Sequence, residues 1–133
     1  METNYICPKC KSFLNIAEKI VLSLKAKDNQ EGLILFEKEL GNYSIKKHDV
    51  IGYKKGDVLG FYCPICHENL AVDDVNSNLA KIIMIDEKGK EFEIVFSKVA
   101  GEHATYKIEE NEIEVFGEDS NKYLNHFGHT PKY

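Results

Sequence analysis

Alternating hydrophobic and polar positions predict strands most clearly in one segment past the middle of the chain. Residues 79–85 are almost continuously apolar, which suits a strand buried on both faces. Residues 86–90 have the composition of a turn, and over residues 91–97 large apolar side chains take every second position. This segment is therefore predicted to form a β-hairpin.

The C-terminal part continues with a second predicted hairpin and a short helix. Apolar residues alternate over 106–108 and 113–115, on either side of a polar turn at 109–111. Over residues 118–128 the period becomes helical, with Tyr123 on the apolar face, before a glycine and a proline. We expect this helix to pack against the sheet.

Residues 13–36 fit two patterns. Apolar positions in the first half fall on one helical face, and Asn15 with Glu18 resembles a capping box. Two apolar runs, 20–24 and 33–36, also flank a polar stretch, as the strands of a hairpin do. The hairpin is favoured over the helix.

Residues 37–55 lack clean periodicity and are predicted to be a long exposed loop. From residue 46 onward it carries five basic or potentially basic side chains, Lys46, Lys47, His48, Lys54 and Lys55. A solvated loop is favoured over an anion-binding surface, because lysines without aromatic or arginine partners are common on surfaces. Residues 58–62 are predicted to form a short strand.

Composition places the chain among ordinary globular proteins. Its 133 residues are 43% hydrophobic and 29% charged, which suits one domain, 1–133. The predicted fold class is mainly β, built from β-hairpins or a small antiparallel sheet with a short C-terminal helix, and α+β is the alternative. No apolar run could span a bilayer and no secretion signal is recognisable, so a cytoplasmic protein without a membrane segment is expected.

Charge disfavours sequence-specific binding of nucleic acid. The formal net charge is −5; residues 1–66 hold ten Lys against eight acids, and residues 67–133 hold seven Lys against fourteen. The acidic second half would repel a phosphate backbone. All seventeen basic residues are Lys, so the arginine that most often contacts guanine is missing.

The four cysteines form two Cys-Pro-x-Cys pairs within matching segments, 5–16 and 61–72, separated by an inserted hairpin and loop over 17–60. A Cys-x-x-Cys turn brings two thiolates to one cation, and four thiolates select Zn²⁺ or iron among the common metals. The candidate ligands are Cys7, Cys10, Cys63 and Cys66. Four buried small hydrophobes, or a thioredoxin-like redox pair, are the less favoured interpretations.

The two segments resemble the knuckles of a zinc ribbon or of the similar rubredoxin-type site. The resemblance covers about a dozen residues at each pair and implies that the four cysteines are the metal ligands. It departs from the commonest pattern at Lys11 and His67, where a glycine usually follows the second cysteine. Because rubredoxins use that glycine heavily, zinc is favoured over iron.

The histidines offer weaker candidates. His67 could act as a ligand or lie beside the ligands, but an exposed position is favoured because four cysteines are available. His126 and His129 lie near the end of the predicted helix, where a cationic side chain interacts well with the helix dipole. Glu102 and His103 could form an acid–base pair, although neighbours on an extended chain point to opposite faces.

These patterns predict a non-enzymatic zinc protein, with a structural four-cysteine site that stabilises a module for binding another protein. A rubredoxin-like iron electron carrier is one alternative. An enzyme that uses His103 and Glu102 is another, and it requires the two side chains to line a shared pocket. No pattern sets the oligomeric state.

Overall fold

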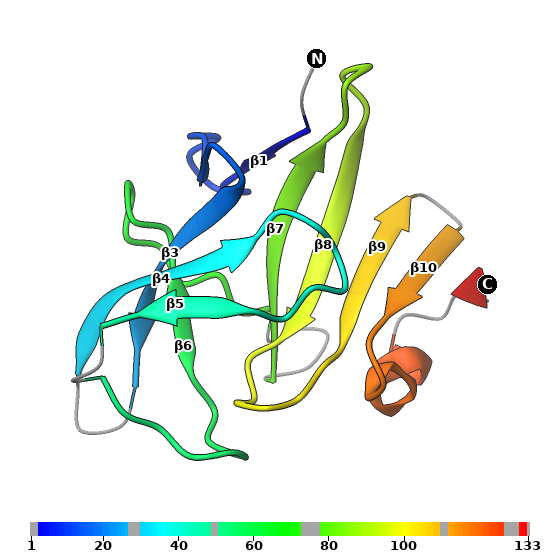
Figure 1. Ribbon diagram of the computed structural model, residues 1–133. Coiled ribbons are helices and arrows are strands. Elements are labelled where there is room, and N and C mark those ends of the chain that lie inside the picture. The colour runs from blue at the N-terminus through cyan, green and yellow to red at the C-terminus, as the bar shows by residue number, and fades with distance from the viewer. Residues whose placement is uncertain are drawn as a thin grey trace.

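The computed structural model describes residues 3–26, 30–48, 51–72, 78–109, 112–126 and 131–132. They form two β sheets that pack face to face, with one short helix beside the second sheet (Figure 1). All strand pairs are antiparallel except one at the C-terminal edge. The prediction of a mainly β fold is confirmed.

The first sheet is built on one long hairpin with short strands along its edges. Its strands are β2 (Asn15–Ile16), β3 (Lys19–Lys25), β4 (Glu31–Glu37), β5 (Ile45–Lys47) and β6 (Gly60–Tyr62). They follow the order β2-β3-β4-β5, and β6 pairs with the far end of β3. Buried and half-buried positions alternate along β3, which explains why this segment is a strand and not the alternative helix.

The second sheet is a meander flanked by a strand from each end of the chain. Its order is β1-β7-β8-β9-β10-β11. The bounds are β1 (Asn4–Ile6), β7 (Leu79–Ile85), β8 (Glu91–Ser97), β9 (Thr105–Glu109), β10 (Glu112–Phe116) and β11 (Pro131–Lys132). Both hairpins predicted in this part of the chain are therefore confirmed.

The two sheets exchange strands. β1 precedes the strands of the first sheet along the chain but pairs with β7 of the second, with Tyr5 opposite Met84. β6 precedes the meander of the second sheet, which begins at β7, but pairs with β3 of the first, with Phe61 opposite Leu24. Such reciprocal contacts are characteristic of a two-fold arrangement.

The strand pairing repeats after 60 residues. In β3–β4 Lys19 lies opposite Glu37, and in β7–β8 the residues 60 positions later, Leu79 and Ser97, lie opposite each other. The next strands keep the same register: Ile34 faces Lys47 in β4–β5, as Ile94 faces Lys107 in β8–β9. The chain thus contains two copies of one unit, each a cysteine knuckle followed by a three-stranded meander.

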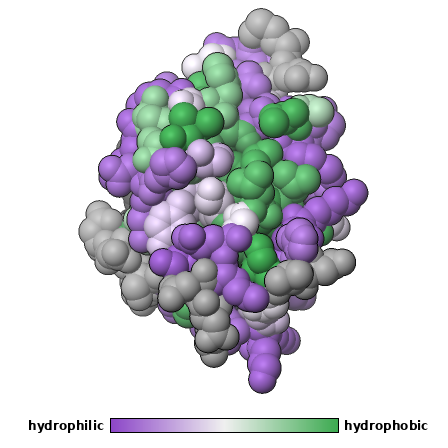
Figure 2. Space-filling model, turned by 90° about the vertical axis from the view of Figure 1, so that its left-hand side faces the viewer, coloured by the Kyte–Doolittle hydropathy of each residue, from purple (hydrophilic) through white to green (hydrophobic). Residues whose placement is uncertain are grey.

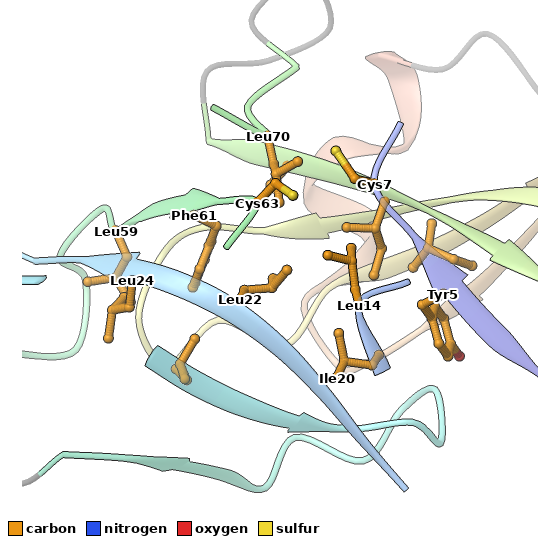
Figure 3. Close-up of a cluster of buried hydrophobic side chains, with 14 of the residues drawn as sticks. Tyr5, Cys7, Leu14, Ile20, Leu22, Leu24, Leu59, Phe61, Cys63 and Leu70 are labelled. Carbon is orange, nitrogen blue, oxygen red and sulfur yellow. The ribbon is translucent and has the colours of Figure 1, made fainter. Parts of the chain in front are cut away.

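Two groups of buried side chains pack against the sheets and stabilise them. The larger lies between the sheets and includes Ile34, Ile82 and Ile94. Figure 3 shows part of this group, with Leu22 and Leu24 from β3 near Phe61 from β6. The smaller lies on the other face of the second sheet, where Tyr106 and Ile113 pack with Tyr123. This placement gives each long strand one apolar face toward the main core.

Three predictions need correction or refinement. The predicted loop over 37–55 contains a strand, β5, because its residues pair with the outer edge of β4. β7 alternates between buried and half-buried positions and is not equally buried on both faces. The C-terminal helix is a 3₁₀ helix, η2 (Ser120–His126), with Tyr123 buried as predicted, and its predicted end at residues 127–128 lies outside the described residues.

Among the described residues, no helix has the length and apolar character needed to cross a membrane.

Candidate metal centre

The first cysteine pair lies in a tight turn at the end of β1. Past Ile6 the chain reverses and returns with Phe13 opposite Ile6. The turn is closed by two backbone hydrogen bonds of 3.0 Å, from Lys11 N–H to the Cys7 carbonyl and from Cys7 N–H to the Ser12 carbonyl. This is the hairpin-tip geometry expected of a metal knuckle.

The second pair repeats these contacts at the end of β6. His67 N–H donates to the Cys63 carbonyl at 2.9 Å, and Cys63 N–H donates to the Glu68 carbonyl at 3.1 Å. Tyr62 and Asn69 bridge across the base of the turn. The two knuckles therefore share one backbone fold, as their sequences suggested.

The four sulfur atoms lie within 4.8 Å of one another. Across the two knuckles, the Sγ atoms of Cys7 and Cys66 are 3.8 Å apart, and so are those of Cys10 and Cys63. Four sulfurs at about 2.3 Å from one metal ion stand about 3.8 Å apart at tetrahedral angles. The spacing fits a tetrahedral metal site, and all four cysteines are free of disulfides.

Backbone amides donate to the inner sulfur of each knuckle. Cys7 Sγ accepts N–H groups of Lys9 and Cys10 at 3.3 and 3.5 Å. Cys63 Sγ accepts those of Ile65 and Cys66 at 3.3 and 3.4 Å. These amides stabilise negative charge on sulfur, as a metal-bound thiolate requires.

The four thiols differ in burial and in pKa. Cys7 and Cys63 are fully buried in the main core (Figure 3). Cys10 is exposed. Burial raises the pKa of Cys63 to about 12. Hydrogen bonds from the side chain and backbone of Ser12 lower the pKa of Cys10 to about 6. A cation at the centre of the cluster would offset the unfavourable charge on the buried sulfur.

The donor set would fill the coordination shell of one metal ion. Four thiolates complete a tetrahedral shell and leave no position for water or substrate, unlike catalytic zinc sites with three protein ligands. Iron also accepts four thiolates, so the donor set selects a thiophilic metal without choosing between the two.

His67 does not join the sulfur cluster. Its side chain is exposed, and the residue adopts a φ of +67° at the position where knuckles commonly have glycine. Lys11 adopts the equivalent conformation with a φ of +64°. Both residues therefore adopt the left-handed backbone conformation that a glycine would adopt at the same position.

Glu102 and His103 line one cavity, of about 280 Å³, between the sheets. Shared lining is what the enzyme interpretation requires, but their functional groups have separate partners. The His103 ring stacks on Tyr43, with centroids 4.3 Å apart, and its Nδ1 lies 3.0 Å from a Glu118 carboxylate oxygen. The geometry gives no direct imidazole–carboxylate pair between Glu102 and His103.

The Glu102 carboxylate is held on the side of η2. It accepts hydrogen bonds from Ser97 Oγ at 2.6 Å, from Lys122 Nζ at 2.7 Å and from the Tyr123 hydroxyl. Burial alone would raise the pKa of Glu102, but these donors outweigh it and hold the pKa below its usual range. Through Lys122 and Tyr123, this carboxylate links η2 to the loop between β8 and β9.

The remaining candidates lie away from the cysteine cluster or outside the described residues. His126 ends η2, but its side chain is not among those described, and neither is any part of His129. In the basic segment, Lys47 Nζ donates to the Ile51 carbonyl at 2.6 Å and lies 5.1 Å from the Tyr53 ring centroid. This lysine thus has a structural role within its own segment.

The sequence interpretation recognised the repeated knuckles but missed the rest of the repeat. The missed signal is a set of identities at a spacing of 60: Glu31 and Glu91, Ile34 and Ile94, Phe36 and Phe96, Lys38 and Lys98, Gly41 and Gly101, Lys47 and Lys107. The knuckles themselves are 56 residues apart, because the second copy has four more residues before its first long strand.

Comparison of the chain with protein-family models, with curated proteins and with solved structures finds no match.

Proposed function

We propose that this chain is a non-enzymatic zinc protein whose four-cysteine site joins its two sheets into a module for binding another protein. One observation carries the proposal: sulfurs from two separate knuckles stand 3.8 Å apart across the pairs, the spacing of a tetrahedral thiolate site.

The position of the cluster supports a structural role for the metal. Each knuckle comes directly after a three-residue strand at the edge of a sheet, β1 in one and β6 in the other. Strands this short contribute few hydrogen bonds, so a metal bridging their ends would add much of their stability. The ion would tie together the two copies of the repeated unit.

Zinc is favoured over iron by the residues after the second cysteines. Lys11 and His67 stand where rubredoxin-type sites prefer glycine. A reducing, cytoplasmic setting suits the site, because it keeps the thiols available for a metal.

A protein partner is supported by exposed apolar side chains near the metal site. Phe13, Ile16 and Ile65, in or next to the knuckles, are 67%, 72% and 59% exposed. Figure 2 shows hydrophobic areas among hydrophilic ones on the face at the left of Figure 1. Exposed apolar patches commonly mark interaction surfaces, and the acidic second half of the chain disfavours nucleic acid as the partner.

Elemental analysis of protein purified under reducing conditions tests the metal. We expect one zinc per chain, lost together with thermal stability on chelation. Cys10→Ser removes a ligand at an exposed position and is expected to lower both zinc content and melting temperature. Lys9→Ala, a change at its exposed neighbour, is the matched control and should keep both.

The other outcomes are distinct. One iron per chain, with the red colour of a ferric tetrathiolate, would replace the zinc proposal by the electron-carrier alternative. Protein without bound metal after purification in the presence of zinc would contradict both.

A further inference from the structure

The cavity between the sheets is separate from the cysteine cluster. It has a volume of about 280 Å³ and is lined chiefly by apolar side chains from both sheets. Its central walls are formed by Leu22, Ile34 and Phe36 on one side and by Ile82, Ile94 and Phe96 on the other. We propose that this cavity binds a small, uncharged aromatic molecule.

The lining follows the internal repeat. Ile34 and Ile94, and likewise Phe36 and Phe96, occupy the same register positions in the two meanders. The cavity therefore lies where the two copies face each other. Since two equivalent loops also line it, around Gly41 and Gly101, both copies contribute to its rim.

The volume indicates the size of the ligand. An engineered cavity of about 150 Å³ lined by aliphatic and aromatic side chains stays dry and takes up benzene. The cavity here is nearly twice as large, at about 280 Å³. It therefore suits a molecule of one or two fused rings, rather than a nucleotide or a peptide.

Aromatic walls favour a flat ligand. Phe61 has its ring centroid 5.6 Å from both Phe36 and Phe96, which are 6.1 Å from each other. All three rings line the cavity. A flat ring can add to this cluster in the edge-to-face and offset arrangements that aromatic groups prefer.

The charged groups of the lining favour an uncharged ligand. Four glutamate and lysine residues line the cavity. Glu37 is paired with Lys19, and Glu102 with Lys122. Lys98 is buried and also has a partner, and Glu39 is exposed. A charged ligand would have to compete with these pairs or lie unpaired in an apolar site, which is costly. The Tyr43 hydroxyl, 3.0 Å from Thr105 Oγ1, is a neutral hydrogen-bonding group at the cavity wall.

The repeat supplies a variant that fills the cavity. Leu40 and Ala100 occupy equivalent positions in the two loops, each just before a glycine with positive φ. The loops share a further contact, from Asn42 N–H to the Glu39 carbonyl and, 60 residues later, from Glu102 N–H to the Val99 carbonyl. Ala100→Leu therefore introduces a side chain that the other copy already accommodates.

Indole serves as the probe, added to the full-length purified protein and followed through methyl resonances in NMR. We expect saturable shifts at Ile34, Ile82 and Ile94, which line the cavity, but not at Ile113, which belongs to the other core group. The expected dissociation constant is on the order of 1 mM or lower, as suits so small a ligand.

Ala100→Leu is expected to weaken indole binding at least tenfold. The matched control is Ala71→Leu, the same change at a half-buried position outside the cavity lining, which should bind as the original protein does. If Ala100→Leu does not fold, Thr105→Ile is used instead and is likewise expected to weaken indole binding. The equivalent position in the first copy is Ile45, and both residues line the cavity.

Absence of saturable shifts, or full binding by the cavity-filling variant, would overturn the proposal. Metal content is measured on the same samples and separates this result from the function proposed above. If the protein contains zinc but does not bind indole, only the proposal of a cavity site is refuted. If it contains no metal but binds indole, only the proposal of a zinc site is refuted.

Discussion

Lys11 and His67 show how much a single backbone conformation matters in this protein. Both have positive φ, 64° and 67°, in a region that β-carbons make unfavourable for residues other than glycine. Each N–H nevertheless closes its knuckle by bonding to the carbonyl of the first cysteine. The hydrogen bonds of the knuckle turn therefore impose this conformation against the local backbone preference of Lys11 and His67.

Replacing either residue by glycine should stabilise the protein. The left-handed conformation costs a residue with a β-carbon about 1–2 kcal/mol, and glycine's greater freedom in the unfolded chain offsets about half of that. We expect Lys11→Gly and His67→Gly each to raise the free energy of unfolding by about 0.5–1 kcal/mol, measured by urea denaturation of metal-loaded protein.

Lys9→Gly is the control within the same turn, since Lys9 is exposed and is not among the residues with positive φ. It should lower the free energy of unfolding. Equal effects of glycine at positions 9 and 11 would contradict the role assigned to the left-handed residue.

At the scale of elements, the short strands β1 and β6 depend on the knuckles at their C-terminal ends. Each strand has three residues, pairs on one side with a seven-residue strand of the sheet and leads directly into its knuckle. The seven-residue strands β3 and β7, by contrast, each pair over their whole length with the next strand of their hairpin, β4 and β8. If the cysteine cluster holds the metal proposed above, the exchanged strands β1 and β6 are expected to be the first elements released when that metal is removed.

Hydrogen exchange measured by mass spectrometry, with and without chelator, tests this order. Peptides covering Asn4–Ile6 and Gly60–Tyr62 should exchange faster after metal removal, by about tenfold or more, because their pairing loses its anchor. Peptides covering Thr105–Glu109 in β9 serve as the internal control and should change little. A uniform rise in all strands would show that the metal stabilises the whole fold equally.

At the scale of the whole molecule, the two copies meet through equivalent residues. Phe36 and Phe96 contact each other across the sheets, and Tyr43 stacks on its counterpart His103 with the rings 6° from parallel. Contacts between equivalent positions lie on the axis that relates the copies. The main core is thus an interface between two halves of one chain.

A double-mutant cycle between Phe36 and Phe96 measures this interface. Phe36→Leu and Phe96→Leu should each lower the free energy of unfolding, and the double variant should lose about 0.5–1.5 kcal/mol less than the sum, the usual coupling of an aromatic pair. The control cycle pairs Phe36 with Phe92, four residues earlier in β8, and should give coupling near zero. Additive losses in the Phe36–Phe96 cycle would contradict direct packing of the sheets.

The sequence by itself determined the hairpins β3–β4, β7–β8 and β9–β10 and the grouping of the cysteines, but not the strand β5. Strands and hairpins arise from a two-residue period, which the residues of one segment carry without help from the others. The match between Cys7–Cys10 and Cys63–Cys66 likewise predicted a common cluster, because the paired turns present thiolates to one metal. Identity of the metal and the single-domain organisation stay predictions.

Only the tertiary structure decided how these elements combine. The pairing of β1 with β7 and of β6 with β3 joins segments far apart in sequence, and an alternating pattern does not name a distant partner. Because the second copy has four extra residues, the knuckles are 56 residues apart, and comparing them does not reveal the 60-residue repeat of the meanders. The cavity exists because two sheets with similar inner faces meet across an axis, and such a space depends on packing between segments that no single stretch encodes.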